Sequence, residues 1–183
     1  MFEFQKIDNL YRLSETGSYL SLSANQLIIG NSYGYFSATF ALLGLVLSAG
    51  CSAFLAIVFI QSAYDKLSGY KGNLDWLKGH FAASPFKNIV PVLLAVLTVL
   101  ESLSGLACAA GVLFCLTETG GIIGLAGLLL AVISLLCLLL GQRLAKDYAG
   151  AASLTGYFLV AMLGIVGAAF SGVLGTVVQY YFL

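Results

Sequence analysis

The chain has few charged residues, few prolines and almost no histidine. Only 9% of its 183 residues are charged, whereas about 25% is typical of a soluble domain. This shortage of charge excludes a water-soluble fold. The lone histidine, His80, excludes haem ligation by two histidines of one chain. Eight basic residues balance eight acidic ones, so the net charge indicates neither nucleic acid nor an acidic partner.

Motifs of enzymes and metal sites are also missing. The chain has no Cys-x-x-Cys pair, no nucleophile beside a base, no phosphate-binding loop and no cluster of metal ligands. We therefore expect no catalytic residues, no metal and no covalently bound cofactor, and an enzyme acting alone is not favoured. The cysteines lie within apolar segments and are interpreted as small packing residues: Cys51, Cys108, Cys115 and Cys137.

Long apolar segments fill most of the chain. Each reaches the roughly 20 residues that a helix needs to cross the ~30 Å hydrocarbon core of a bilayer. Short connections between the second and third segments and between the third and fourth make these pairs antiparallel neighbours. The sequence therefore predicts an all-α membrane protein, an up-down bundle of four transmembrane helices. The segments are Phe36–Ser62, Ile89–Leu116, Gly121–Leu140 and Ser153–Val178.

Residues 1–35 form a polar lead-in, and residues 36–183 form the membrane domain. Met1–Asn25 is mixed in charge, so we expect no cleavable signal peptide, and the first span serves as the insertion signal.

The connection between the first and second spans alternates aromatic residues with lysines, as is typical of the headgroup interface. Within it we predict a short amphipathic helix with Asn73 as its N-cap and Pro85 helping to stop it. Its side chains either anchor the helix in the interface or dock a partner subunit. The expected anchors are Tyr70, Lys71, Trp76 and Lys78.

Small residues recur every four positions along the fourth span and permit close contact between helix backbones. They serve either packing within the chain or an interface with another subunit. One stripe is Gly164, Ala168 and Gly172, and the other is Gly167, Ser171 and Gly175.

Basic residues predict the orientation. The connections that follow the first and third spans hold six basic residues, and the opposite side holds Lys6 and Arg12. Because basic residues favour the cytoplasmic side, we expect both termini outside a bacterial cytoplasmic membrane. The six are Lys66, Lys71, Lys78, Lys87, Arg143 and Lys146.

Glu101 lies in the middle of the second span, ~18 Å along its helix at about 1.5 Å per residue. A carboxyl group at that depth must be protonated or paired. Ser102, Ser104 and Gly105 make its surroundings polar and open. Glu101 is therefore either a ligand contact or proton acceptor facing a cavity, or a structural hydrogen bond between helices.

A second polar cluster ends the first and third spans on one side of the membrane. Its members allow two ion pairs, Asp65–Arg143 or Lys66–Asp147. The cluster is either a structural clamp or a pocket for the polar end of a quinone or lipid. Together with Glu101, the candidate ligand-binding residues are Lys66, Gln61, Arg143 and Asp147.

The segments Phe54–Leu67 and Gly141–Ala152, with the mid-helix Glu101 followed by Gly105, resemble the DoxX family of small bacterial four-helix membrane proteins. The resemblance covers roughly residues 40–180, and it implies that Lys66 and Glu101 occupy polar positions that recur in the family. It further implies a membrane subunit of redox-linked assemblies. A related DoxD-type protein is a subunit of thiosulfate:quinone oxidoreductase, and other members accompany sulfurtransferase or superoxide dismutase partners.

The favoured hypothesis is an integral membrane subunit of a quinone-associated redox complex, with membrane lipids and other subunits as partners. The alternative is an accessory structural subunit of a larger envelope complex without catalytic activity. A small transporter or channel is less favoured, because one carboxylate and four helices give little to line a path.

Overall fold

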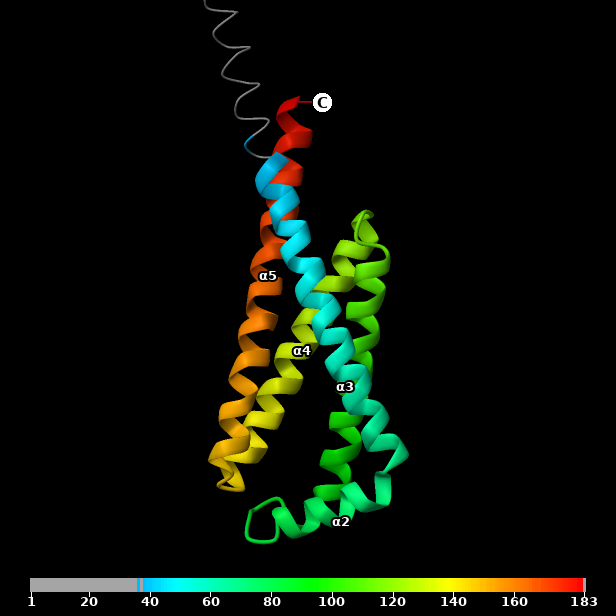
Figure 1. Cartoon of the computed structure of the whole chain (residues 1–183), viewed down its shortest axis with the longest axis vertical. Helices are drawn as coiled ribbons and strands as arrows, with labels where there is room; N and C mark the ends of the chain where they lie inside the picture. The colour runs from blue at the N-terminus through cyan, green and yellow to red at the C-terminus, as the bar shows by residue number, and fades with distance from the viewer. Residues whose placement is uncertain (1–35, 37, 183) are drawn as a thin grey trace, which may run out of the picture.

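The computed structural model describes residue 36 and residues 38–182, and it describes side-chain surroundings as far as residue 172. The expected lead-in, residues 1–35, lies outside the described residues. Every regular element in the described part is a helix. Four helices are long and apolar enough to span a membrane, which confirms the predicted bundle (Figure 1). They are a first helix, Ala38–Ser68, then α3 (Val90–Leu113), α4 (Glu118–Leu144) and α5 (Tyr148–Phe182).

The helices extend beyond the apolar segments that predicted them. The first helix ends at Ser68 instead of Ser62, and α4 ends at Leu144 instead of Leu140. Apolar residues mark the part of a helix in hydrocarbon, but backbone hydrogen bonding continues into the polar interface. In the opposite direction, α3 already ends at Leu113, because the chain turns at residues 114–117 before Glu118 starts α4.

Capping side chains set two of these boundaries. The hydroxyl of Thr117 accepts a hydrogen bond of 3.0 Å from the amide of Gly120 at the start of α4. In the same way, a carboxylate oxygen of Asp147 accepts a 2.8 Å bond from the amide of Gly150 at the start of α5. Both bonds satisfy backbone donors that have no partner within the helix.

The short helix predicted between the first two spans is α2, Tyr70–His80, which lies crosswise under the spanning helices (Figure 1). Its predicted N-cap is wrong. Gly69 precedes the helix, and Asn73 lies inside it. The side-chain amide of Asn73 instead donates a 3.0 Å hydrogen bond to the carbonyl of Asp65, which joins α2 to the end of the first helix. The helix ends before Pro85 and does not need it as a stop.

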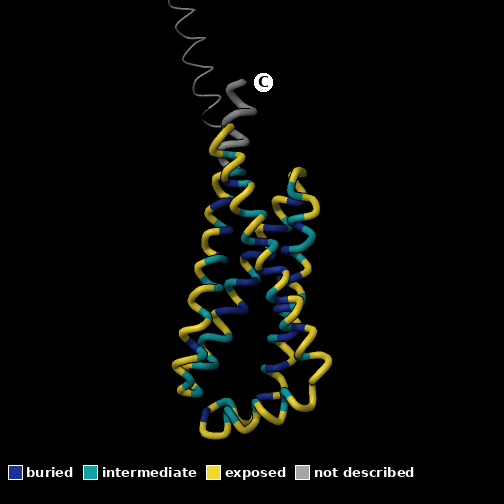
Figure 2. The backbone as a smooth tube through the Cα atoms, viewed as in Figure 1, coloured by how far each residue is buried: buried dark blue, intermediate teal, exposed yellow. Residues whose placement is uncertain are grey.

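The four spanning helices pack around a small buried core. Leu55 and Phe59 of the first helix, Cys108 of α3 and Leu128 of α4 belong to it, together with Ala161 of α5. Buried residues therefore follow the sides on which the helices meet, and exposed residues follow the outer sides (Figure 2). In a membrane, the exposed apolar side chains face lipid.

The fourth spanning helix packs against the first through glycine. A Cβ atom on Gly167 would lie 2.8 Å from the carbonyl oxygen of Gly44 and from the amide nitrogen of Ser48. A Cβ on Gly164 would lie 2.9 Å from Cβ of Cys51. Close backbone contact of this kind is what small residues permit. These two glycines therefore pack within the chain.

At Gly172 a Cβ would meet no atom of the described residues within 4 Å, so of the two alternatives only an interface with another subunit stays a prediction for this position. A repeat of four residues drifts around a helix of 3.6 residues per turn, so the stripe leaves the contact. Ala168 and Ser171 are half-buried, and the surroundings of Gly175 lie outside those the structure describes.

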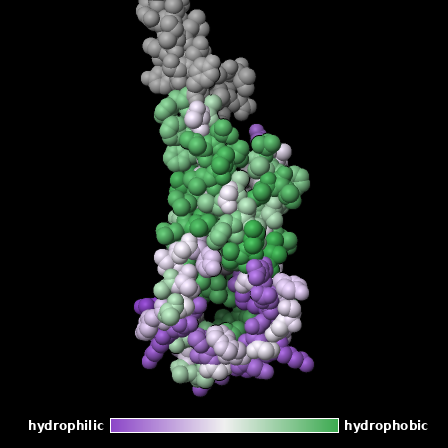
Figure 3. Space-filling model, in the orientation of Figure 1, coloured by the Kyte–Doolittle hydropathy of each residue, from purple (hydrophilic) through white to green (hydrophobic). Residues whose placement is uncertain are grey.

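Close contacts and open space lie at opposite ends of the bundle. Gly44 and Gly167, and likewise Gly111 of α3 and Gly124 of α4, meet toward the end where the first helix begins. Polar residues gather at the other end, around α2 and the connection between α4 and α5, and the visible face is hollowed there (Figure 3). The candidate ligand-binding residues predicted from the sequence lie toward this open end.

Candidate functional site

Glu101 forms a buried ion pair with Lys66. The Lys66 ammonium lies 2.7 Å from Oε2 of Glu101, whose side chain is 1% exposed, while that of Lys66 is 18% exposed. Ser62 joins both residues: its hydroxyl donates to Oε2 of Glu101 at 3.1 Å and accepts from Lys66 at 2.6 Å. The three side chains therefore form one hydrogen-bonded cluster, the Lys66 cluster, between the first helix and α3.

Helix geometry explains how the Lys66 cluster forms. Ser62 and Lys66 are four residues apart, so they share one face of the first helix. Gly105 lies one turn after Glu101, where a Cβ would come within 2.9 Å of Cγ1 and 3.0 Å of the backbone nitrogen of Ile60. Glycine at this position lets the two helices approach closely, which brings Ser62 and Lys66 within reach of Glu101.

One oxygen of Glu101 remains without a partner. Oε2 accepts both hydrogen bonds of the Lys66 cluster, and the buried Oε1 accepts none from the residues that the structure describes. The neighbouring serines do not supply one. Ser104 donates 3.0 Å to the carbonyl of Gly127 on α4, and Ser102 donates 2.7 Å to the carbonyl of Thr98. A buried acceptor without a donor is costly and calls for an explanation.

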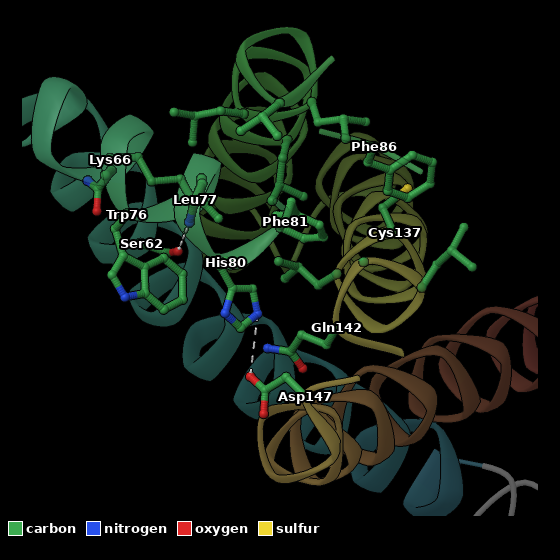
Figure 4. Close-up of a pocket in the computed structure, with 18 of the residues that line it drawn as sticks. Ser62, Lys66, Trp76, Leu77, His80, Phe81, Phe86, Cys137, Gln142 and Asp147 are labelled. Atoms are coloured by element: carbon green, nitrogen blue, oxygen red, sulfur yellow. Dashed lines mark hydrogen bonds and ion pairs between the residues drawn. The ribbon is translucent and has the colours of Figure 1, made fainter. Parts of the chain in front are cut away.

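A cavity at the open end, cavity A, has a volume of about 430 Å³ and lies between α2, α3, α4 and the first helix (Figure 4). This is within the range of roughly 300–1,000 Å³ of small-molecule sites. Lys66, His80, Gln142 and Asp147 contribute polar or charged groups to its lining. Gln142 contributes a second buried oxygen, Oε1, without a partner among the described residues. Ser62, Asp65 and Asn73 add polar groups, and most of the remaining lining is aromatic or aliphatic, including Trp76, Phe81, Phe86, Leu93, Leu94 and Leu97.

The second cavity, cavity B, has a volume of about 350 Å³ and lies between the first helix, α3, α4 and α5. Glu101 lines it, whereas Lys66 lines only cavity A. Ser62 and Asp65 line both cavities, so the Lys66 cluster stands between them. An ammonium group with three N–H donors thus borders one cavity, and a carboxylate that can only accept borders the other.

Neither of the two predicted ion pairs forms. Lys66 pairs with Glu101 instead of Asp147, because the longer first helix carries it to the face that meets α3. Asp147 lies 3.9 Å from Nε2 of His80, and Arg143 lies over the ring of Tyr148, with 5.0 Å between its Cζ and the ring centroid. Folding of α2 beneath the bundle brings His80 to Asp147, and Trp76 stacks on His80 at 4.7 Å between ring centroids (Figure 4).

The structure divides the candidate residues into two groups. Glu101 and Lys66 meet, Gln61 lines cavity B and Asp147 lines cavity A, whereas Arg143 lines neither. The sequence interpretation missed Ser62, His80 and Tyr157 as lining residues. The spacing of Ser62 from Lys66 was a usable signal for the first, but nothing local in the sequence marks the other two. The expected anchors Tyr70, Lys71, Trp76 and Lys78 are exposed on α2.

Fold and site together define an integral, multi-pass membrane protein with a polar cluster between two cavities at one end of its bundle. Comparison of the chain with protein-family models, curated proteins and solved structures finds no match. Any more specific function therefore has to be argued from the site.

Proposed function

We propose that this membrane protein is a subunit of a quinone-linked redox complex and binds the quinone head in cavity A, beside Lys66. The proposal adopts the resemblance to the DoxX family and a bacterial cytoplasmic membrane with both termini outside. One observation carries it: a partly buried, charged hydrogen-bond donor borders a largely apolar cavity at the polar end of a membrane bundle.

The Lys66 cluster supplies the polar contact. Two of the three N–H donors of Lys66 are used by Ser62 and Glu101. The remaining donor suits a carbonyl oxygen of a quinone ring, which can only accept a hydrogen bond. Glu101 keeps the ammonium in place, since the charged pair is held by a 2.7 Å bond.

The rest of cavity A supports the same ligand. Trp76, Phe81 and Phe86 offer aromatic surface for a flat ring, and the leucines of α3 offer aliphatic surface for an isoprenoid chain. His80 and Gln142 supply further polar groups to the lining. The cavity lies where the hydrophobic surface of the molecule gives way to its polar end (Figure 3), which is the depth at which amphiphilic head groups reside.

A purely structural subunit is the second candidate. The Lys66–Glu101 pair ties the first helix to α3, and the His80–Asp147 pair ties α2 to the start of α5. Stabilisation of the fold is enough to explain both ion pairs. Under this alternative the cavities hold only lipid, and the exposed aromatic and basic residues of α2 dock another subunit.

Quinone content after mild purification distinguishes these candidates. The full chain is extracted with its associated proteins, and bound quinone is quantified by mass spectrometry per mole of protein. We expect near-stoichiometric quinone in the wild type and a loss of at least fivefold in Lys66→Gln, which shortens the donor and removes its charge. Lys87→Gln is the matched control, because Lys87 is exposed at the same end and lines neither cavity. Absence of quinone from the wild type, or equal quinone in both variants, contradicts the proposal and favours the structural subunit.

A further inference from the structure

Cavity B differs from cavity A in lacking a basic side chain among the described residues that line it. Two carboxylates, Asp65 and Glu101, line it, together with the amide of Gln61 and the ring of Tyr157. No lysine, arginine or histidine is among its lining residues in the described part of the chain. Its polar wall therefore presents mainly hydrogen-bond acceptors and negative charge.

The unpartnered Oε1 of Glu101 belongs to this wall. Glu101 is 1% exposed and lines cavity B, and its Oε1 is buried without a donor among the described residues. An ionised carboxylate cannot donate. Any group that satisfies Oε1 must therefore bring a hydrogen of its own, which a quinone carbonyl does not have.

Charge counting indicates that this group is a cation. Asp65 and Glu101 contribute two negative charges, and Lys66, bound to the other oxygen of Glu101, contributes one positive charge, which leaves one negative charge at the wall. Glu101 is almost fully buried, so its charge is screened far less than in water, whereas Asp65 is exposed and adds its charge at the mouth of the cavity. A ligand with one positive charge restores balance, and a neutral alcohol does not.

The remaining lining indicates an organic ion instead of a metal ion. Val58, Phe59, Leu135 and Leu154 give cavity B a broad apolar wall, while hard metal ions require six or more oxygen ligands. No group of three or more metal-binding side chains occurs among the described residues. Gln61 and Asp65 are exposed, so the cavity has a polar entrance at the end near α2.

We propose that cavity B is a binding site for a primary alkyl- or arylalkylammonium ion. The ammonium group donates to Oε1 of Glu101 and faces the carboxylate of Asp65, and the hydrocarbon part packs against Phe59, Leu135 and the Tyr157 ring. The proposal does not rest on quinone binding in cavity A, because Glu101 lines only cavity B.

Benzylammonium and benzyl alcohol test the proposal, since the two probes have nearly the same shape and differ in charge. Binding to the full-length protein in phosphatidylcholine nanodiscs is measured by isothermal titration calorimetry, with protein-free nanodiscs subtracted. We expect saturable binding of benzylammonium at least about tenfold tighter than that of benzyl alcohol. Equal affinities, or equal thermal stabilisation by sodium chloride and benzylammonium chloride, would overturn the proposal.

Two variants localise the site. Glu101→Gln replaces one oxygen with a donor and should weaken benzylammonium at least tenfold, and Glu118→Gln, the same change at an exposed position on α4, should have no effect. Because Glu101→Gln also disturbs Lys66, Asp65→Asn provides a test that keeps the Lys66–Glu101 pair. It should weaken benzylammonium several-fold and leave benzyl alcohol unchanged, with Asp75→Asn as its exposed control on α2. Unchanged benzylammonium affinity in Asp65→Asn, or equal losses in the controls, would show that cavity B is not the site.

Discussion

Lys66 and Glu101 join the first helix to α3 through a 2.7 Å ion pair that is almost completely enclosed on the glutamate side. The pair lies near the polar end of the bundle, because Lys66 is only two residues from the end of its helix. Its ammonium reaches inward to a carboxylate on the next spanning helix. Removing either side chain therefore leaves the other without its partner in poorly solvated surroundings. The resulting loss of stability can be measured directly.

The first prediction concerns this coupling. Glu101→Leu should lower the free energy of unfolding by about 2–3 kcal/mol, less than the cost of breaking a fully buried pair, because Lys66 is partly exposed and can turn outward. Adding Lys66→Met removes the orphaned charge and should recover part of the loss. Unfolding in mixed detergent and dodecyl sulfate micelles measures both. If the two losses simply add, the residues are not coupled in solution.

The second prediction compares two glycines of α5. Gly167→Leu should cost about 1–3 kcal/mol by overpacking, because even a Cβ there would approach the backbone of Gly44 and Ser48. Gly172→Leu should change stability by less than about 0.5 kcal/mol, since a Cβ there meets no atom within 4 Å. Thermal unfolding in detergent measures the stability change of both variants. Equal destabilisation by both substitutions would contradict the packing of α5 described above.

The third prediction separates two roles of Asp147, which caps α5 through Gly150 and faces His80 of α2. Asp147→Ala removes the cap and should lower stability by about 1 kcal/mol, whereas Asn, itself a good N-cap, should cost less. Both variants lose the charge opposite His80. Hydrogen exchange of α2 should therefore rise equally in the two variants while their unfolding midpoints differ. Equal midpoints would show that the cap adds little.

The fourth prediction concerns topology. The basic residues of α2 and of the α4–α5 connection lie at one end, so a cysteine at position 75 should be labelled from the cytoplasm. A cysteine at position 119, at the start of α4, should be labelled from outside. A membrane-impermeant maleimide applied to intact cells and to inverted vesicles, in a variant without the native cysteines, reads both positions. Labelling of both from one side would refute four crossings.

The membrane-spanning architecture follows from the sequence because hydropathy depends on composition along each segment. The partner of Glu101 does not, since it depends on where the first helix ends and on how α3 crosses it. The apolar segment that predicted the first span ends at Ser62, whereas the helix continues to Ser68, and Lys66 lies in this extension. The same holds for His80 and Asp147, 67 positions apart in the chain, because only the folding of α2 beneath the bundle brings them within 3.9 Å.

The glycine contacts and the cavities lie at opposite ends of the molecule, so close packing and enclosed space are separated along the bundle. Helix backbones come into close contact where Gly44 meets Gly167 and where Gly111 meets Gly124, because these residues have no side chains to separate them. The space that the helices enclose therefore lies toward the α2 end, where side chains set the shape of both cavities.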